Sequence, residues 1–256
     1  MRYAFLSDIH ANGPALDAVL QDIAARDGID AVYHLGDLVG YASWPNEVIA
    51  MLRDADIPGV AGNYDSTVAT HYKHCGCRSE NAHQEELAHR SFNWTVEHTS
   101  ERSKQFMRSL PFRIDIRPFG GHQSGPTIRL VHGNQGLNTV YVTEDRTDDF
   151  LARMAEGMGA KPGDIICFGH THKPWHRVVG DVHFMNAGSV GRPKDGDPRA
   201  GYMVLDLTER GVAVAFVRVA YDVEAAARGI LASQLPGEFA DFLRTGGKAS
   251  APASGA

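Results

Sequence analysis

Aspartate, asparagine and histidine side chains gather in five short motifs along the chain. Two polar side chains two residues apart on an extended turn can project an oxygen and a nitrogen toward one point. Carboxylate, amide oxygen and imidazole are all ligands for divalent metals. The motifs are Asp8-Ile9-His10, Gly36-Asp37, Gly62-Asn63, His132-Gly133 and Gly169-His170-Thr171-His172. They predict a metal centre with seven candidate ligands.

Each motif follows a short hydrophobic segment of the kind that forms a strand. Because the carboxyl ends of parallel strands meet at one edge of a sheet, the scattered ligands are expected to converge there. The glycines permit sharp turns and close approach of the backbone. The segments cover residues 2–6, 31–35, 57–61, 127–132 and 164–168.

A single motif would be weak evidence for a metal. An Asp-x-His pair is more often a surface turn or a hydrogen-bonded couple, and buried histidines can simply be core residues with satisfied hydrogen bonds. Neither alternative explains why all five motifs follow predicted strands in one order. The ordered set therefore favours metal binding.

The remaining segments predict an α/β architecture. Strands and helices alternate in the first part of the chain, which is typical of a mainly parallel sheet, and later strands read as antiparallel neighbours. Further strands are predicted at residues 112–117, 178–185, 201–207 and 212–219, and helices at 13–28, 45–53, 149–158, 222–231 and 238–243. Two sheets packed between helices are expected.

The chain reads as one domain. Residues 1–247 contain no linker rich in Gly, Ser or Pro that would separate independent units. A helical, cap-like insertion is expected at about residues 66–110, where polar and histidine-bearing segments replace the strand pattern. Small polar residues and a proline predict a disordered tail at residues 248–256.

Composition narrows the class of protein. With 43% hydrophobic and 22% charged residues the chain is globular, and it lacks the apolar run of about 18 residues that a membrane helix needs. The net charge of -6 gives no general attraction for nucleic acid. Asp8 comes too early for a secretory signal, and with only three cysteines no disulfide framework is expected. We expect a cytoplasmic protein, with its oligomeric state open.

The order of the motifs resembles that of the calcineurin-like metallophosphoesterases. Their pattern is Asp-x-His, Gly-Asp, Gly-Asn-His-Asp or a variant, a lone histidine, and Gly-His-x-His. The turn Asn186-Ala187-Gly188-Ser189 is also similar to one in the bacterial and archaeal phosphodiesterases of this group. The resemblance covers nearly the whole chain. It implies a four-layer α-β-β-α sandwich of two mixed sheets flanked by helices, of the metallophosphatase type.

The resemblance also implies two divalent metal ions, for which Mn, Fe, Zn, Co and Ni all suit the ligands. Two cations would acidify a bridging water, and the resulting hydroxide would attack phosphorus in line. One ion would bind Asp8, His10 and His172, and the other Asn63, His132 and His170, with Asp37 bridging the two.

One position departs from the family pattern. The family most often has a histidine where this chain has Tyr64, followed by the expected Asp65. That histidine is taken to stabilise the transition state or protonate the leaving oxygen, and a phenol is a weaker acid than imidazolium. Diester or phosphoanhydride substrates, whose leaving groups need less protonation, are therefore favoured. Tyr64, Asp65 and Asp37 are the catalytic candidates; His71 or His74 could replace the missing acid, or could be exposed loop residues.

Two other features leave alternatives open. The cysteines of the cluster His71, His74, Cys75, Cys77 and His83 could bind a third metal through their Cys-x-Cys spacing, or the cluster could form the wall of a cap loop. Arg192, just past the Gly-Ser turn, and His71 are candidates for binding a substrate phosphate. An ordinary surface charge is the alternative for Arg192.

Taken together, the sequence predicts a metal-dependent phosphoester hydrolase. We expect a phosphodiesterase or a hydrolase of nucleotides or dinucleoside polyphosphates, acting on a small phosphoester or nucleotide. One alternative is a phosphomonoesterase for phosphoproteins or nucleotides. Another is a non-catalytic metal-binding scaffold, against which the presence of all seven ligands argues. No general nucleic-acid partner and no membrane partner are expected.

Overall fold

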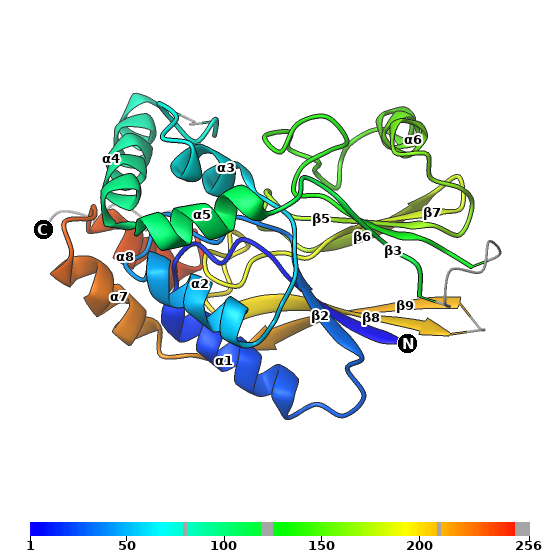
Figure 1. Ribbon diagram of the computed structural model, residues 1–256, viewed down its shortest axis with the longest axis horizontal. Helices are drawn as coiled ribbons and strands as arrows, with labels where there is room; N and C mark the ends of the chain where they lie inside the picture. Colours follow the sequence, from blue (N-terminus) through cyan, green and yellow to red (C-terminus); the bar gives the residue numbers. More distant parts are fainter. Residues whose placement is uncertain (79–80, 119–124, 209–210, 249–256) are drawn as a thin grey trace, which may run out of the picture.

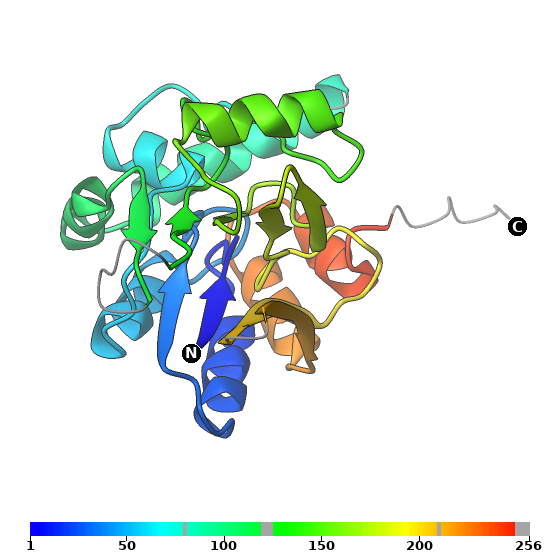
Figure 2. The ribbon, with the colours of Figure 1, turned by 90° about the vertical axis from the view of Figure 1, so that its right-hand side faces the viewer.

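The fold is α/β, with two sheets packed face to face between outer layers of helices (Figures 1 and 2). The structure is a computed structural model that describes residues 1–78, 81–118, 125–208 and 211–248. The expected layered sandwich of two mixed sheets is confirmed. Of the predicted disordered tail, residues 249–256 lie outside the described residues. The single-domain assignment stays a prediction.

The first sheet carries the first two motifs. Its strand order is β2-β1-β8-β9, with β1 (Arg2–Leu6) parallel to β2 (Ala31–His34). β8 (Ala200–Thr208) and β9 (Gly211–Val219) complete it in antiparallel fashion. Because β1 and β2 pair in register up to Leu6 and His34, the loops that follow them start side by side.

The second sheet carries the last two motifs. Its strand order is β3-β4-β5-β7-β6, and β4 (Ile128–Leu130), β5 (Ile165–Phe168) and β7 (Val182–Asn186) run parallel. β3 (Ile114–Ile116) and β6 (Trp175–Val179) are antiparallel strands at its edges. The loops after β4 and β5 therefore also start side by side.

The core between the sheets holds the two pairs of loops against each other. Phe5, Leu130, Cys167, Met185 and Leu205 are fully buried in it. Strands covered on both faces read as continuous hydrophobic runs, and this explains why the segments before the motifs show no polar alternation.

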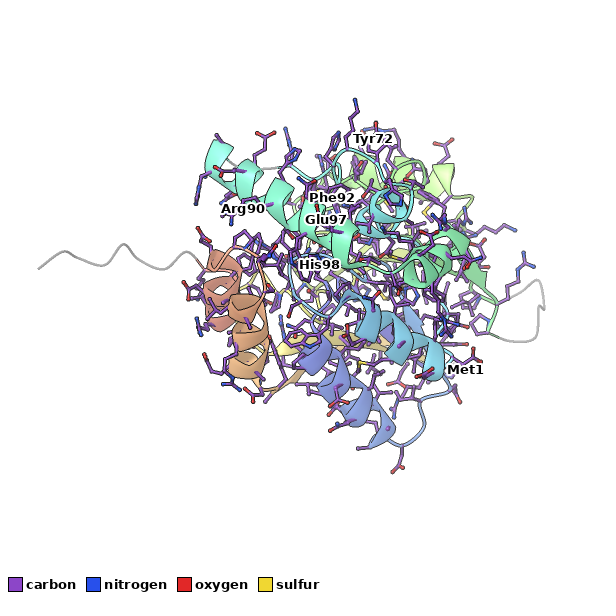
Figure 3. The ribbon with its side chains drawn as sticks, turned by 60° about the vertical axis from the view of Figure 1, so that its left-hand side comes forward. Met1, Tyr72, Arg90, Phe92, Glu97 and His98 are labelled. Carbon is purple, nitrogen blue, oxygen red and sulfur yellow. A yellow bond between two sulfur atoms is a disulfide. The ribbon has the colours of Figure 1, made fainter. Side chains whose placement is uncertain are left out.

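The helices cover the sheets and gather at one end of them. In Figure 1, α6 lies above the sheets and α1 and α2 below, whereas α3, α4, α7 and α8 lie at the end toward which β1 runs from the marked N-terminus. α4 turns Phe92 into the core and Arg90 and Glu97 to solvent (Figure 3). The helices are α1 (Gly13–Ala24), α2 (Pro45–Asp54), α3 (Asn63–Ala69), α4 (Ala82–His98), α5 (Glu101–Ser109), α6 (Asp148–Gly157), α7 (Val223–Ala232) and α8 (Glu238–Thr245). None of the helices in the described part of the chain is long and apolar enough to cross a membrane.

Three element predictions need correction. Residues 57–61 form no named strand, because Gly59 makes only one isolated bridge, to His34. Residues 178–185 are not one strand but part of the hairpin β6–β7, which turns at Gly180 and Asp181 with positive φ at both. A Gly-Asp pair suits such a turn, and the hydrophobic residues on both sides of it hid the turn in the pattern. The helix predicted at residues 13–28 ends at Ala24.

Candidate metal centre

The seven predicted ligands come together at the carboxyl ends of two pairs of parallel strands. None of them exposes more than 3% of its surface. The strands belong to two sheets, so the expectation that one parallel sheet would position all of them is only partly right. Asp8 and His10 follow β1, Asp37 follows β2, Asn63 opens α3, His132 follows β4, and His170 and His172 follow β5.

Asp8, His10 and His172 form the first ligand group. Nε2 of His172 lies 3.3 Å from Oδ1 of Asp8 and 3.2 Å from Nε2 of His10. Nε2 of His10 lies 3.8 Å from the same aspartate oxygen. A single cation among these three atoms would contact all of them.

Asp37, His132 and His170 form the second ligand group. Nε2 of His132 lies 3.4 Å from Oδ2 of Asp37 and 3.3 Å from Nδ1 of His170. Oδ1 of Asn63 lies 3.1 Å from Nε2 of His132, so the amide oxygen joins this group. Oδ2 of Asp37 is also 3.8 Å from Nε2 of His10 in the first group. One aspartate oxygen thus faces both groups, as the bridging role requires.

The hydrogen bonds leave the ligand atoms ready for a cation. Nδ1 of His10, His132 and His172 each pairs with a backbone carbonyl, of Val39, Leu35 and Arg192, at 3.0, 2.7 and 2.6 Å. These bonds fix the tautomer that leaves Nε2 as an acceptor. Among the described residues, the buried Oδ1 of Asp8 has no hydrogen-bond partner. A buried carboxylate oxygen without a partner is costly, and a cation would compensate it.

The pKa shifts of His10 and His170 fit the same interpretation. Burial lowers the pKa of His10 and of His170 to about 3, so both imidazoles are neutral ligands at pH 7. Burial raises the pKa of Asp8 to about 7, against the opposing effects of His132 and of hydrogen bonds from Ser7 and His170. Against the effect of burial, His132 lowers the pKa of Asp37, and Asp37 raises the pKa of His132 to about 9.

The backbone around the ligands is strained. Five of the seven ligands have positive φ, in the left-handed region that non-glycine residues adopt at a cost of about 1–3 kcal/mol each. Asp and His tolerate it better than most residues. A Cβ at Gly62 would lie 2.2 Å from the backbone nitrogen of Asp37, so glycine is required where the two loops touch. The five residues are Asp8, His10, Asp37, His170 and His172.

Asp65 holds two ligand loops together. Its carboxylate accepts hydrogen bonds from the backbone N–H groups of Gly62, Asp37 and Leu38 at 2.8, 2.9 and 2.8 Å. Burial, followed by the charge of Asp37, raises its pKa to about 7, and the N–H groups of Gly62 and Leu38 oppose that shift. The sequence suggested a catalytic role for Asp65, whereas its contacts are those of a residue that positions Asp37.

The Asn-x-Gly-Ser turn supports the first ligand group. Nδ2 of Asn186 donates to the carbonyl of Gly169 at 2.6 Å, and Oγ of Ser189 donates to the carbonyl of Asp8 at 2.8 Å. Nδ2 of Asn12 donates to the carbonyl of Gly191 at 2.9 Å. The sequence did not indicate a role for Asn12, because an asparagine before a helix reads as an ordinary cap.

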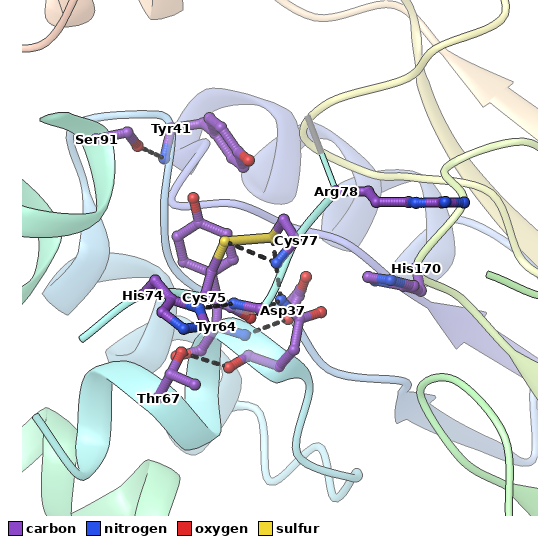
Figure 4. The surroundings of a disulfide bond; sticks show 12 residues. Asp37, Tyr41, Tyr64, Thr67, His74, Cys75, Cys77, Arg78, Ser91 and His170 are labelled. Atoms are coloured by element: carbon purple, nitrogen blue, oxygen red, sulfur yellow. Dashed lines mark hydrogen bonds between the residues drawn. A yellow bond between two sulfur atoms is a disulfide. The ribbon is translucent and has the colours of Figure 1, made fainter. Parts of the chain in front are cut away.

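Cys75 and Cys77 are joined by a disulfide (Figure 4), and both contact the side chain of Asn63. Nδ2 of Asn63 donates to the carbonyl of Cys75 at 3.0 Å, which turns the amide oxygen toward His132. The sequence predicted no framework of several disulfides, and this single bridge spans only Gly76, whose φ is 75°. Neither candidate metal group among the described residues contains a cysteine.

Tyr64 is fully buried beneath the first ligand group. Its ring meets the ring of His10 edge-on at 5.6 Å. Figure 4 shows the ring of Tyr64 beside that of Tyr41, with 5.1 Å between the ring centres. Burial, followed by the neighbouring Tyr41, raises the pKa of Tyr64 well above 10. The phenol is therefore neutral and has no exposed surface from which to reach a leaving group.

The other two sequence candidates lie in different surroundings. His71 and His74 are exposed. Within the described residues, no hydrogen bond or ion pair joins either histidine to a ligand. Arg192 is half-buried, and its carbonyl pairs with the ligand His172. The ordinary surface charge considered for Arg192 does not describe this position.

Known proteins share this fold and this order of elements. Residues 1–210 match the calcineurin-like phosphoesterase superfamily domain. An uncharacterised protein of Methanocaldococcus jannaschii is 31% identical over 250 residues, covering 91% of this chain and 93% of that protein. A metallophosphoesterase of Sphaerobacter thermophilus is 28% identical with a TM-score of 0.74, covering 96% of this chain and 100% of that one. A hypothetical protein of Pyrococcus horikoshii OT3 has the same fold, with 21% identity, a TM-score of 0.80 and coverages of 97% and 99%. This chain belongs to the calcineurin-like phosphoesterase superfamily.

Proposed function

We propose that this protein hydrolyses phosphodiesters or phosphoanhydrides of small molecules, such as nucleotides, with two divalent metal ions. The observation that carries the proposal is the single oxygen of Asp37 that faces both ligand groups, 3.4 Å from His132 and 3.8 Å from His10. Two separate mononuclear sites would not need a shared carboxylate. When bound, the ions supply Lewis-acid activation of a water nucleophile and neutralise charge on the phosphoryl group.

The residues of the chain perform the positioning that this chemistry requires. Nδ1 hydrogen bonds to carbonyls hold His10, His132 and His172 with Nε2 toward the centre. Asp65 fixes the loop of Asp37. Because these side chains are buried, electrostatic interactions at the centre are stronger than in water. A pre-ordered set of ligands of this kind favours turnover over simple storage of a metal ion.

The preference for diesters and anhydrides rests on Tyr64. The residue that follows Asn63 in the sequence is Tyr64 and not a histidine, and the buried phenol with its raised pKa donates a proton poorly. Leaving groups such as nitrophenolate or a nucleotide phosphate are stable as anions. Substrates that carry them should therefore be cleaved faster than alkyl monoesters.

Metal removal tests the proposed function. We expect the purified protein to hydrolyse bis(p-nitrophenyl) phosphate after loading with Mn²⁺, Zn²⁺, Co²⁺, Ni²⁺ or Fe²⁺, and to lose this activity in EDTA. Activity should return when the metal is added back, and an alkyl monoester such as glycerol 2-phosphate should be the poorer substrate. A metal-replete protein that hydrolyses neither compound would contradict the proposal and favour the scaffold alternative. Faster turnover of the monoester would favour the phosphomonoesterase.

Replacing Tyr64 by phenylalanine tests the role of the phenol. Because its hydroxyl is buried, Tyr64→Phe should lower kcat for a diester with an alkyl leaving group by less than about 3-fold, whereas losing a general acid costs about 100-fold or more. Tyr202→Phe is the matched control, since that tyrosine is also buried and donates instead to Asp22 at 2.6 Å. A loss of about 100-fold confined to alkyl leaving groups would identify Tyr64 as the acid.

A further inference from the structure

The guanidinium group of Arg192 is held between aromatic rings. Its central carbon lies 4.0 Å from the centre of the Tyr41 ring and 3.8 Å from that of Phe242. The Phe239 ring is 5.8 Å away. Because two rings pack closely on the guanidinium, its N–H edges are the groups left to make hydrogen bonds. The side chain is therefore preorganised for planar recognition of an anion.

The backbone of Arg192 is tied to the first ligand group. Its carbonyl pairs with Nδ1 of His172 at 2.6 Å, and its N–H donates to Oγ of Ser189 at 2.8 Å. Ser189 in turn donates to the carbonyl of Asp8 at 2.8 Å. The Tyr41 ring that packs on the guanidinium also meets the ring of His10 edge-on at 5.0 Å. These contacts place the cation beside the metal centre, on the side of Asp8, His10 and His172.

The charge of Arg192 lacks a counter-ion in the fold. Among the described residues, no carboxylate lies within ion-pair distance of its guanidinium, whereas the buried Arg129 has Asp164 at 2.7 Å. Removing a guanidinium from water without a partner is unfavourable. Burial accordingly lowers the pKa of Arg192, although the group remains a cation at neutral pH. A cation kept in this position at a cost to stability indicates an anionic ligand.

We infer that Arg192 binds a second anionic group of the substrate, next to the phosphate that is cleaved, and so selects phosphoanhydrides over diesters with uncharged substituents. This inference rests on the proposed function. A nucleoside diphosphate or a dinucleoside polyphosphate carries such a neighbouring phosphate, whereas bis(p-nitrophenyl) phosphate does not. Arg192 would donate hydrogen bonds from its N–H edges to two phosphate oxygens.

The test compares two substrates in one variant. For Arg192→Gln, the ratio of kcat/KM for diadenosine tetraphosphate to kcat/KM for bis(p-nitrophenyl) phosphate should fall by about 10- to 100-fold, the range expected for a lost charge-assisted hydrogen bond. Arg192→Lys keeps the positive charge but lacks the planar guanidinium group, so it should recover part of the ratio of the two kcat/KM values. Arg53→Gln is the matched control, because Arg53 also packs on an aromatic ring, that of Phe106 at 5.7 Å, outside the metal centre.

Binding of an analogue that is not hydrolysed provides an independent readout. The affinity of α,β-methylene-ADP, measured by calorimetry with and without Mn²⁺, should weaken about 10-fold or more in Arg192→Gln and stay unchanged in Arg53→Gln. An equal loss on both substrates, or unchanged analogue binding, would overturn the inference. If the wild type fails to hydrolyse bis(p-nitrophenyl) phosphate with any metal, the proposed function fails instead, and analogue binding still decides the role of Arg192.

Discussion

Replacing Asp37 by alanine should reduce metal-dependent turnover of bis(p-nitrophenyl) phosphate by about 1,000-fold or more. Oδ2 of Asp37 is the atom that faces both His132 and His10, and Oδ1 accepts the backbone N–H of Tyr64 at 2.9 Å. Its loss should weaken both metal positions together. Steady-state kinetics combined with elemental analysis of the same samples measures both effects.

Two further variants separate charge from shape at this position. Asp37→Asn keeps the size of the side chain and an oxygen for the Tyr64 N–H, so it should fold like the wild type and still lose turnover. Asp241→Asn removes an exposed carboxylate that pairs with Arg244 on the same helix, α8, and this variant should behave like the wild type. If Asp37→Ala kept its metal and its turnover, the shared-carboxylate arrangement would be wrong.

Removing one histidine from each ligand group should empty one metal position at a time. His172→Ala takes a ligand from the group of Asp8, and His132→Ala takes the atom that lies within 3.4 Å of Asp37, Asn63 and His170. Each variant should lose about one metal ion per chain and about 100-fold or more in turnover. Because the proposed function has two ions acting as a unit, we expect the double variant to be little worse than the poorer single one.

His176→Ala is the matched control for this pair. His176 is a half-buried histidine whose ring stacks on His183 at 5.3 Å in the β6–β7 hairpin, outside both ligand groups. The His176→Ala variant should retain both ions and full turnover. If His172→Ala lost both ions while His132→Ala kept both, the prediction that each histidine holds one separate metal position would be contradicted.

The ligands were predictable from the sequence because each follows a hydrophobic segment. Strand ends, glycines and ligand types are local features, and Asp8, His10, Asp37, His132 and His170 could be assigned from them. The sequence did not reveal which strand belongs to which of the two sheets, because pairing such as that of β1 with β8 joins residues about 200 positions apart. The packing of the whole chain decides which strands pair.

The surroundings of the ligands were harder to predict. Asp65 follows Tyr64 in a motif, but whether its carboxylate faces a substrate or three backbone N–H groups depends on how two loops meet. The cage of Arg192 includes Phe239 and Phe242 from α8, about 50 residues further along the chain. No periodicity or spacing connects such positions.

Metal analysis of crystals tests the central claim most directly. Elemental analysis and anomalous scattering from the loaded protein should show two ions per chain, one against Asp8, His10 and His172 and one against Asn63, His132 and His170. Asp37 should contact both. A single ion in protein that still hydrolyses bis(p-nitrophenyl) phosphate, or an ion pair without Asp37 between the two, would contradict the account.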